Sequence, residues 1–489
     1  MLDINLFRKD KGGNPELVRE SEKRRYAKED LVSVIMDKDE EWRTLRGELD
    51  FLNKYKRLAS KVYGKLLGQM KKNKQEIPEV DDTPLPESLT KDLTKTFADK
   101  ANYETLDFLS LKKLIAFIDS EQKRTTESIS VAETTRDNTL KKIGNIVHET
   151  CVVHNNEDFN GVEKEWGTPK TKEDAPFNHV DLMTAIGGVD LDAGALVSGS
   201  RGYFLMGSLV RLNQALIAYG MDFLEKKGYV PVQTPFFMNK EIMQCVAQLE
   251  QFDEELYHVS EGDDKDVKYL IATSEQPICA LNMNKWITEE QLPIKYVGIS
   301  TCFRKEAGSH GRDTAGIFRV HQFEKIEQFV ITSPRDNISW KMQEEMLKNS
   351  EDFYQSLEIP YRVVNIVSGK LNNAAAKKLD LEAWFPNSQT YRELVSCSNC
   401  TDYQSRRLNI RFGVPGKNKQ QDNGLEKEYV HMLNSTLTAT SRTLCCILEN
   451  NQTDEGIVVP KILRNYMGGL EMIKYVRQPV DGSQQQKKK

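Results

Sequence analysis

Residues 300–330 constrain the fold more than any other part of the chain, because they read as two β-strands joined by a polar loop. Side chains alternate across a strand with a period of two. Cys302, Arg304 and Glu306 therefore share one face of the first strand, and the alternation resumes from Ile317 to Val330. Glycine and charged residues fill the loop at 308–316. The pattern predicts an antiparallel hairpin with a long loop.

The second of these strands would carry polar and aromatic side chains on one face, namely Arg319, His321, Phe323, Lys325 and Glu327. Such a surface could bind a nucleoside triphosphate beside a small zwitterion. Phe323 and Glu327 would lie ~13 Å apart at ~3.3 Å per residue, which suits a nucleobase at one and an amino acid at the other. A solvated, charged sheet face is the commoner reason for such a pattern. The hairpin by itself does not decide between the two.

Five further segments decide the question in favour of binding. They are Val197 to Gly207, Gly228 to Met238, Thr273 to Pro277, Arg392 to Arg407 and His431 to Gln452. Together with the hairpin, which resembles motif 2, they resemble the class II aminoacyl-tRNA synthetases in the form typical of seryl-tRNA synthetases, and they occur in that family's order. The resemblance implies an α+β fold, with a catalytic domain at 177–476 built on an antiparallel sheet with flanking helices.

An N-terminal domain at 1–151 precedes this region. Residues 37–73 contain no proline and follow a heptad, which predicts a helix at about 38–73. A second apolar stripe predicts a helix at about 110–148, and prolines among acidic residues at 76–107 predict an irregular insertion between the two. The heptad has one seam at Leu45, Leu52, Ala59 and Leu66, and another at Trp42, Leu49, Tyr63 and Met70, interrupted by Lys56. The two helices are expected to form an antiparallel α-helical coiled-coil arm.

The first helix of this arm carries basic residues without any acidic residue between Phe51 and Gln75. Because the formal net charge of the chain is -5, contact with RNA must come from such a local patch. Composition alone gives a spacer or dimerisation element about equal weight. The resemblance implies an arm that grips serine tRNA, and the candidate tRNA-binding residues are Lys54, Lys56, Arg57, Lys61 and Lys65.

Polar residues with two prolines predict a linker at 152–176, and low complexity predicts a disordered basic tail at 477–489. No signal-like segment or run of 18 apolar residues is found, and the eight cysteines are scattered in apolar surroundings. We therefore expect a reducing, cytoplasmic location. Cys397 and Cys400 have zinc-knuckle spacing but no second pair, so no zinc is expected.

The resemblance assigns site residues by their positions in these motifs. Arg304 and Arg442 are the implied catalytic residues, with Arg304 between the α-phosphate and the serine carboxylate, and Glu393 and Ser396 are the implied Mg²⁺ ligands. Their spacing of three predicts a bulge or turn. Serine binding is implied for Thr273, Glu275, Arg304, Glu327 and Asn434. Thr273 and Glu275 are two apart in a run at 269–277 that reads as a strand, which would place them on one face. ATP binding is implied for Arg304, Lys305, Glu306, Val320, His321, Gln322, Phe323, Glu393, Leu394, Val395, Ser396 and Arg442.

The implied function is that of a serine–tRNA ligase, which activates L-serine with ATP and Mg²⁺ and transfers it to the 3′ end of serine tRNA. Whether selenocysteine tRNA is a further substrate stays open. The alternative is a non-catalytic RNA-binding paralogue, which an intact set of ATP and serine residues disfavours. A motif 1 resemblance over Leu209 to Lys227 implies a homodimer, although the same apolar stripe is equally compatible with an ordinary core helix.

Overall fold

The computed structural model describes residues 1–78, 85, 89, 101–247, 255–260, 267–306, 316–415 and 428–480. The chain divides into two compact units. One comprises Ile4–Arg19 and Lys28–Ile143, and the other comprises Met1–Asp3, Glu20–Ala27 and the chain from Gly144 onward. Most of the predicted insertion at 76–107 and most of the predicted tail lie outside the described residues. Within the described ranges, every helix is too short or too polar to cross a lipid bilayer.

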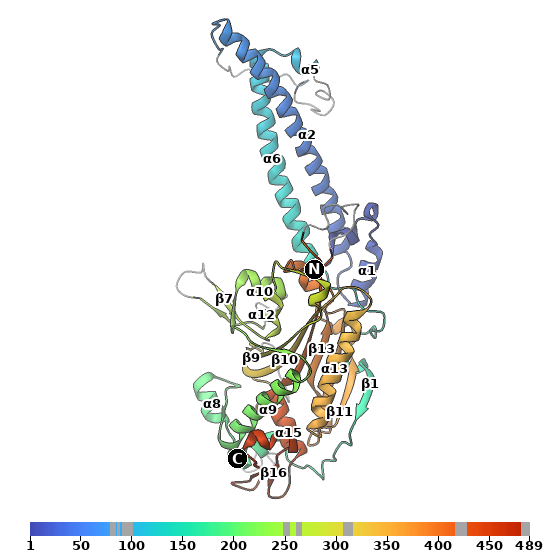
Figure 1. Ribbon diagram of the computed structural model, residues 1–489, viewed down its shortest axis with the longest axis vertical. Helices are drawn as coiled ribbons and strands as arrows, with labels where there is room; N and C mark the ends of the chain where they lie inside the picture. Colours follow the sequence, from blue (N-terminus) through green and yellow to red (C-terminus); the bar gives the residue numbers. More distant parts are fainter. Residues whose placement is uncertain are drawn as a thin grey trace, which may run out of the picture. The chain divides into compact units, whose positions relative to one another are not determined.

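The smaller unit is built on two long helices, α2 (Leu31–Lys72) and α6 (Phe108–Leu140), which run antiparallel side by side (Figure 1). Leu52, Tyr55 and Ala59 of α2 pack with Leu111 and Leu114 of α6. The unit also holds α5 (Ala101–Glu104) and the first half of α1 (Pro15–Arg24), whose residues from Glu20 onward belong to the larger unit. The predicted helical arm is confirmed.

The heptad register is confirmed on one seam only. Leu52 and Ala59 are buried as predicted, whereas on the other seam Tyr55 and Val62 are buried and Lys56 is not. Tyr63 of that seam is partly buried and stacks on Phe108 of α6, with 4.6 Å between the ring centres. Tyr55 and Val62 each precede a predicted seam position by one residue.

The second arm helix ends earlier than predicted, at Leu140 and not at 148. The backbone N–H of Gly144 donates to the Glu22 carboxylate at 3.0 Å and so cannot continue the helical hydrogen bonds. The first helix starts at Leu31, seven positions before the predicted 38.

The larger unit contains an eight-stranded sheet in the order β1-β11-β12-β13-β15-β10-β9-β4, antiparallel except at the β4–β9 edge. Its strands are β1 (Gly161–Trp166), β4 (Val230–Gln233), β9 (Ile294–Phe303), β10 (Gln322–Thr332), β11 (Tyr361–Asn365), β12 (Lys377–Phe385), β13 (Thr390–Asn399) and β15 (His431–Ala439). The predicted antiparallel-sheet fold is confirmed. Segment 152–176, predicted to be a linker, instead supplies β1, which pairs with β11.

One face of this sheet is covered by the helices α9 (Gly207–Glu225), α13 (Ile338–Ser356) and α15 (Thr440–Asn450). Gln328 of β10 donates to the Met346 carbonyl of α13 at 3.0 Å, and the α-carbon of Gly220 in α9 faces Ile326. The stripe at Leu209, Leu212 and Leu216 is fully buried in this core, so these side chains pack within the unit. Because alternate residues point to opposite faces, Phe323, Lys325 and Glu327 face away from these helices.

Smaller elements surround the sheet. In the described part of this unit the other α-helices are α7 (His179–Ala185), α8 (Leu191–Ser198), α10 (Lys240–Val246), α12 (Glu275–Ala280) and α14 (Tyr403–Arg407). The remaining strands are β2 (Val189–Asp190), β3 (Phe204–Leu205), β5 (Phe237–Asn239), β6 (His258–Val259), β7 (Lys268–Leu270), β8 (Trp286–Ile287), β14 (Arg411–Phe412), β16 (Gly456–Val458) and β17 (Met472–Lys474).

Candidate active site

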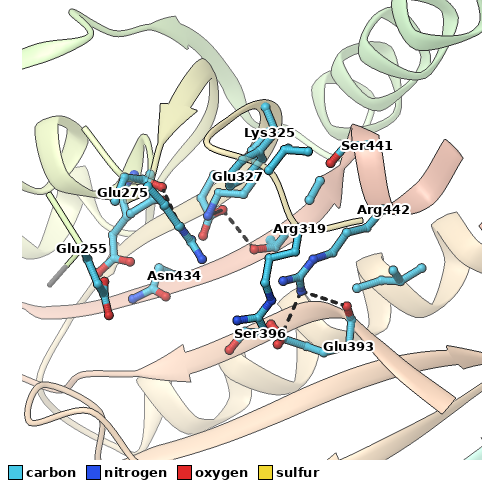
Figure 2. Close-up of a pocket in the computed structure, with 18 of the residues that line it drawn as sticks. Glu255, Glu275, Arg319, Lys325, Glu327, Glu393, Ser396, Asn434, Ser441 and Arg442 are labelled. Carbon is cyan, nitrogen blue, oxygen red and sulfur yellow. Dashed lines mark hydrogen bonds and ion pairs between the residues drawn. The ribbon is translucent and has the colours of Figure 1, made fainter. Parts of the chain in front are cut away.

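A pocket of about 340 Å³ opens on the sheet face opposite α9 and α13. Twelve of the residues predicted to bind ATP, serine or Mg²⁺ line it. They are Thr273, Glu275, Arg304, Glu306, Val320, Phe323, Glu327, Glu393, Leu394, Ser396, Asn434 and Arg442. Figure 2 shows Glu275 and Asn434 at one end, Glu393, Ser396 and Arg442 at the other, and Lys325 and Glu327 between them.

Arg304 follows directly after β9 and lines the pocket. Its backbone is fixed by the N–H donating to the His321 carbonyl at 2.9 Å, and its Nε donates to the Ala272 carbonyl at 3.3 Å. The guanidinium lies 5.3 Å from the centre of the Phe323 ring. Its outer nitrogens can therefore serve an anion while the ring beside it offers a flat apolar surface.

Glu306 continues this rim in an unusual backbone conformation, with φ 51°. Its carboxylate lies 3.3 Å from Arg319 Nη1 and 3.9 Å from Arg201 Nη1. Two guanidinium groups thus hold an acceptor at the mouth of the pocket, near the aromatic ring of Phe323.

Thr273 and Glu275 line the pocket, but the strand predicted for them is wrong. Strand β7 ends at Leu270, and Glu275 is the first residue of α12. Pro277 suits the first turn of a helix, where its missing N–H costs nothing. The Glu275 backbone N–H donates to Thr273 Oγ1 at 3.3 Å, and Gln404 Nε2 donates to Glu275 Oε1 at 3.0 Å.

Glu275 and Glu327 are two carboxylates in one polar cavity. Burial raises the pKa of Glu275, and repulsion from Glu327 raises it further, while Gln404, Lys325 and Arg304 oppose the shift. Glu327 is only 2% exposed and pairs with Lys325 Nζ at 2.6 Å. It also accepts a hydrogen bond from Thr436 Oγ1 at 3.2 Å.

Glu393 and Ser396 both face the pocket because β13 carries the predicted bulge. Val395 pairs with Leu381 and Glu393 with Glu382, so Leu394 is the extra residue. Glu393 accepts from Arg442, with 3.1 Å to its carbonyl and 3.6 Å to its carboxylate. The surrounding protein disfavours the Glu393 charge, yet nearby cations, Arg442 first, outweigh this and hold its pKa below the usual value.

Arg442 occupies the third position of α15. A cation here opposes the helix dipole unless an anion lies nearby. Besides the Glu393 contacts, its Nε donates to the Phe318 carbonyl at 3.3 Å, and the guanidinium lies over the Phe318 ring. These contacts direct a fixed positive charge into the pocket.

Four predicted ATP-binding residues do not line the pocket: Lys305, His321, Gln322 and Val395. His321 and Gln322 face a second pocket of about 420 Å³, together with Tyr203 and Tyr257. Strand pairing begins only at Gln322, so the alternation predicted from Arg319 onward does not hold at His321. Val395 points into the core. The candidate tRNA-binding residues, Lys54 to Lys65, belong to the other unit.

Several pocket residues were not predicted as functional. Arg319 and Lys325 lie on the face that strand alternation marked, so their pattern was visible in the sequence. Glu255, Gln276, Asn372, Lys378, Ser398 and Thr436 also line the pocket. Lys378 and Ser398 face each other across β12 and β13, a pairing that depends on long-range register.

Cys397 and Cys400, the two cysteines with zinc-knuckle spacing, are buried, free thiols. Asn434 Nδ2 lies 3.6 Å from Cys400 Sγ, and Cys397 Sγ lies 3.7 Å from the Gln343 carbonyl. Across the described residues, no cluster of three or more His, Cys, Asp or Glu side chains is placed to hold a metal.

Comparisons with known proteins place this geometry in a family. Residues 257–451 match the tRNA synthetase class II core domain (G, H, P, S and T), and residues 1–85 match the seryl-tRNA synthetase N-terminal domain. The chain is 50% identical to the cytoplasmic serine–tRNA ligase of Oryctolagus cuniculus, over 100% of this chain and 94% of that protein.

Two solved structures are similar along nearly the whole chain. One is the cytoplasmic serine–tRNA ligase of Naegleria fowleri in complex with AMP, with 54% identity, a TM-score of 0.84, and coverage of 98% of this chain and 99% of that one. The other is the seryl-tRNA synthetase of Pyrococcus horikoshii complexed with ATP, with 35% identity, a TM-score of 0.80, and coverage of 98% and 100%.

Proposed function

Because this chain belongs to the seryl-tRNA synthetases, a family of class II aminoacyl-tRNA synthetases, we propose that the pocket described above joins serine to ATP. The chain is a serine–tRNA ligase, and it is a catalytic synthetase, not a non-catalytic paralogue. Serine and ATP give seryl-adenylate and pyrophosphate. A ribose hydroxyl at the 3′ end of serine tRNA then takes the seryl group, and AMP leaves.

The first step needs alignment and charge more than a nucleophilic side chain. A serine carboxylate oxygen attacks the α-phosphorus, and the bond to pyrophosphate breaks with its electron pair leaving on the pyrophosphate. Holding both reactants in line can supply ~7 to 11 kcal/mol of the barrier. Fixed cations then stabilise charge that grows on the phosphoryl oxygens.

Arg304 would bridge the serine carboxylate and the α-phosphate. Its guanidinium can serve two acceptors in a fixed plane, which a lysine ammonium cannot do. The single observation that carries the proposal is the position of Arg304 between the carboxylate pair Glu275 and Glu327 and the Glu393–Arg442 end of one pocket. Arg442 would hold the terminal phosphates.

The adenine would stack on Phe323, with its edge donating to Glu306. The orientation of Glu306 by two arginines supports this role. Backbone groups of Val320 to Gln322 would add contacts, which does not require their side chains to reach the pocket.

Serine would bind at the other end, with Thr273 and Glu275 receiving its ammonium and Glu327 and Asn434 closing around its side chain. A site that hydrogen-bonds a hydroxyl can reject the analogue that lacks it by ~10⁴-fold, which would separate serine from alanine. Threonine must be excluded by size.

Mg²⁺ would bind Glu393 and Ser396. Both offer hard oxygen donors to one pocket, and with only two protein ligands the remaining positions fall to phosphate oxygens and water, as Mg²⁺ prefers. When bound, the ion would neutralise phosphate charge. Burial raises the pKa of the neighbouring Asp380 to about 7, with Lys378 opposing the shift and Glu393 adding to it.

Serine-dependent exchange of pyrophosphate into ATP tests the activation step. Arg304→Ala should lower exchange by about 10²- to 10³-fold or more, because it removes a fixed cation from the reacting centre. Arg335→Ala removes an arginine whose side chain is 58% exposed outside the pocket and should change nothing. Wild-type protein that binds ATP but shows no serine-dependent exchange would sink the proposal.

The helical arm would grip serine tRNA through phosphate contacts along α2. Lys54, Arg57, Lys61 and Lys65 are exposed there, while Lys56 is half-buried and pairs with Asp119 at 2.6 Å. A lysine and arginine stripe binds nucleic acid largely through counterion release.

Neutralising Lys54, Lys56, Arg57 and Lys61 together should spare exchange and weaken tRNA charging. Each lost phosphate contact should also reduce the slope of log affinity against log salt by about 0.9. Neutralising Lys112, Lys113 and Lys123 on α6 provides a control with lysines of the other arm helix. A quadruple variant that charges tRNA normally would contradict the role given to α2.

We also propose that the enzyme is a homodimer in the cytoplasm. The relatives from Oryctolagus cuniculus and Naegleria fowleri are cytoplasmic enzymes by name. Large apolar side chains are exposed along residues 196–237, including Leu196 at 88%, Val197 at 71% and Val230 at 57%. Val230 lies on β4, the edge strand of the sheet, where a partner could cover it.

A further inference from the structure

Lys325 is a buried cation inside the amino-acid end of the pocket. Its side chain is 7% exposed, and its Nζ lies 2.6 Å from Glu327 Oε2. In the sheet, Lys325 pairs with Ser300 of β9 on one side and with Ala439 of β15 on the other. A lysine is rarely buried to this extent unless its charge is balanced. The pair with Glu327 supplies that balance.

The two carboxylates of this end have different partners. Glu275 accepts from the neutral amide of Gln404 at 3.0 Å, whereas Glu327 is paired with the lysine ammonium and accepts from Thr436. The two are close enough for Glu327 to disfavour the Glu275 charge. Among the described residues, Glu327 therefore has a direct ion pair with a lysine, whereas Glu275 has no direct ion pair with a lysine or arginine.

An α-amino acid with a hydroxyl side chain poses a problem of orientation for such a pocket. Its ammonium is attracted to either carboxylate, and its hydroxyl can donate to either. A carboxylate that already holds a cation attracts an ammonium weakly but still accepts from a hydroxyl, because an ionised carboxyl group has about four acceptor sites.

We propose that Lys325 is a specificity-determining positioning residue, which cancels the charge of Glu327 so that Glu327 receives the serine hydroxyl and leaves the ammonium to Glu275. This inference rests on the serine site proposed above. It adds a reason why the two carboxylates bind different groups of serine, which is that one of them already has a counter-ion.

The proposal predicts which ligand the pocket would choose without Lys325. 2,3-Diaminopropionate has the shape of serine with an ammonium in place of the hydroxyl. In the wild-type pocket that second ammonium would meet Lys325 as a like charge, which disfavours binding. In Lys325→Met it would meet an unpaired Glu327 carboxylate instead.

The experiment compares serine with 2,3-diaminopropionate at about pH 6, where both amines of the analogue are protonated. Pyrophosphate exchange gives kcat/KM for each, and calorimetry with the full-length enzyme gives binding. In Lys325→Met the preference for serine should fall by about 100-fold or more. Lys325→Arg keeps the charge and should keep the preference, even if exchange slows.

Lys378→Met is the matched control, because Lys378 lines the same pocket but pairs with Asp380 at 3.6 Å. Its loss should raise the KM for ATP and leave the serine preference unchanged. A shift of the same size in Lys378→Met would overturn the proposal, as would an unchanged preference in folded Lys325→Met.

Lys325→Met leaves a buried charge unpaired and so threatens folding. If Lys325→Met shows no cooperative thermal unfolding, two further variants test the role of Lys325. Glu327→Gln leaves the lysine unpaired and should bind the diamine still more weakly relative to serine. Lys325→Met/Glu327→Gln restores neutrality and should return the preference to within about threefold of wild type. The opposite result in either variant refutes the charge argument.

The failure of this inference is distinguishable from failure of the proposed function. Wild-type enzyme without serine-dependent exchange would refute the function. Normal serine exchange by wild type, with a preference that ignores the charge at 325 and 327, would refute the role of Lys325 alone.

Discussion

Gly316 begins the described chain after the gap at 307–315 and has φ +68°, a left-handed conformation that favours glycine. A Cβ added there would lie 2.8 Å from Val180 Cγ2 and 3.1 Å from the His179 ring. Residues 318–320, which line the pocket, follow almost at once. The site of the proposed adenine contacts therefore depends on the absence of one methyl group.

Gly316→Ala should destabilise the protein and raise the KM for ATP. Gly468→Ala is a control for backbone strain, because Gly468 has φ +69° but no atom within 4 Å of an added Cβ. Strain alone should cost ~1 to 2 kcal/mol, and the contact at Gly316 a further ~1 to 3 kcal/mol. Thermal melts of both variants measure the difference. Equal melting temperatures would show that the α7 contact yields easily.

At the scale of residues, the sequence correctly predicted the face on which side chains lie wherever a strand is regular. Alternation placed Phe323, Lys325 and Glu327 on one face, and all three line the pocket. It failed at His321, because the residues before Gln322 are not paired in the sheet. Lys378 could not be predicted, since its place in the pocket follows from the register between two strands and not from its neighbours in sequence.

At the scale of elements, a buried ion pair connects α7 with α15. His179 Nδ1 lies 2.8 Å from Glu449 Oε1, and both side chains are nearly inaccessible. Burial opposes protonation of His179, but Cys445 and Glu449 outweigh it and raise its pKa to about 10. Because α15 also carries Arg442 at its other end, this pair anchors the helix that presents the phosphate-binding arginine.

The pair predicts how stability depends on pH. An unfolded histidine has a pKa near 6.5, below the folded value, so the folded state binds the extra proton between about pH 6.5 and 10. This contribution is complete below pH 6.5 and is lost as the pH rises toward 10. Denaturant unfolding at pH 6 and pH 9 should show that loss in the wild type and a smaller one in His179→Gln. Replacing the partly exposed His154 should leave this loss of stability between pH 6 and pH 9 unchanged. If the His154 and His179 variants reduce that loss equally, the α7–α15 pair is not its cause.

Element types were more predictable than their ends. The arm helices and the hairpin strands followed from spacing. The bulge between Glu393 and Ser396 followed from their spacing together with the shared role that the resemblance implied. The segment at Thr273–Glu275 did not, because a short apolar run fits a strand or a helix start equally well until its packing is known. Strand β1 was missed since five of its six residues are exposed and it carries no alternating apolar pattern.

At the scale of the whole molecule, the proposed dimer predicts a change in mass on mutation. Leu196→Asp combined with Val230→Asp should reduce the particle from about twice the 56.0 kDa of one chain to a single chain, as measured by light scattering. Charges buried without partners oppose association. Val131→Asp on the arm, where the side chain is 66% exposed, is the control and should leave the mass unchanged. A double variant of unchanged mass would place the interface elsewhere.

The strand order also determines when the sheet can close. Strand β15 lies between β13 and β10 and so joins β4, β9 and β10 to the strands from β1 to β13. It is made after all of them, at residues 431–439. During synthesis the edges of β10 and β13 therefore stay unpaired until β15 is made. Unpaired strand edges promote aggregation of growing chains. The ribosome must deliver residue 439 before either half of the sheet is protected, so slow translation between Asn399 and His431 would favour aggregation over folding.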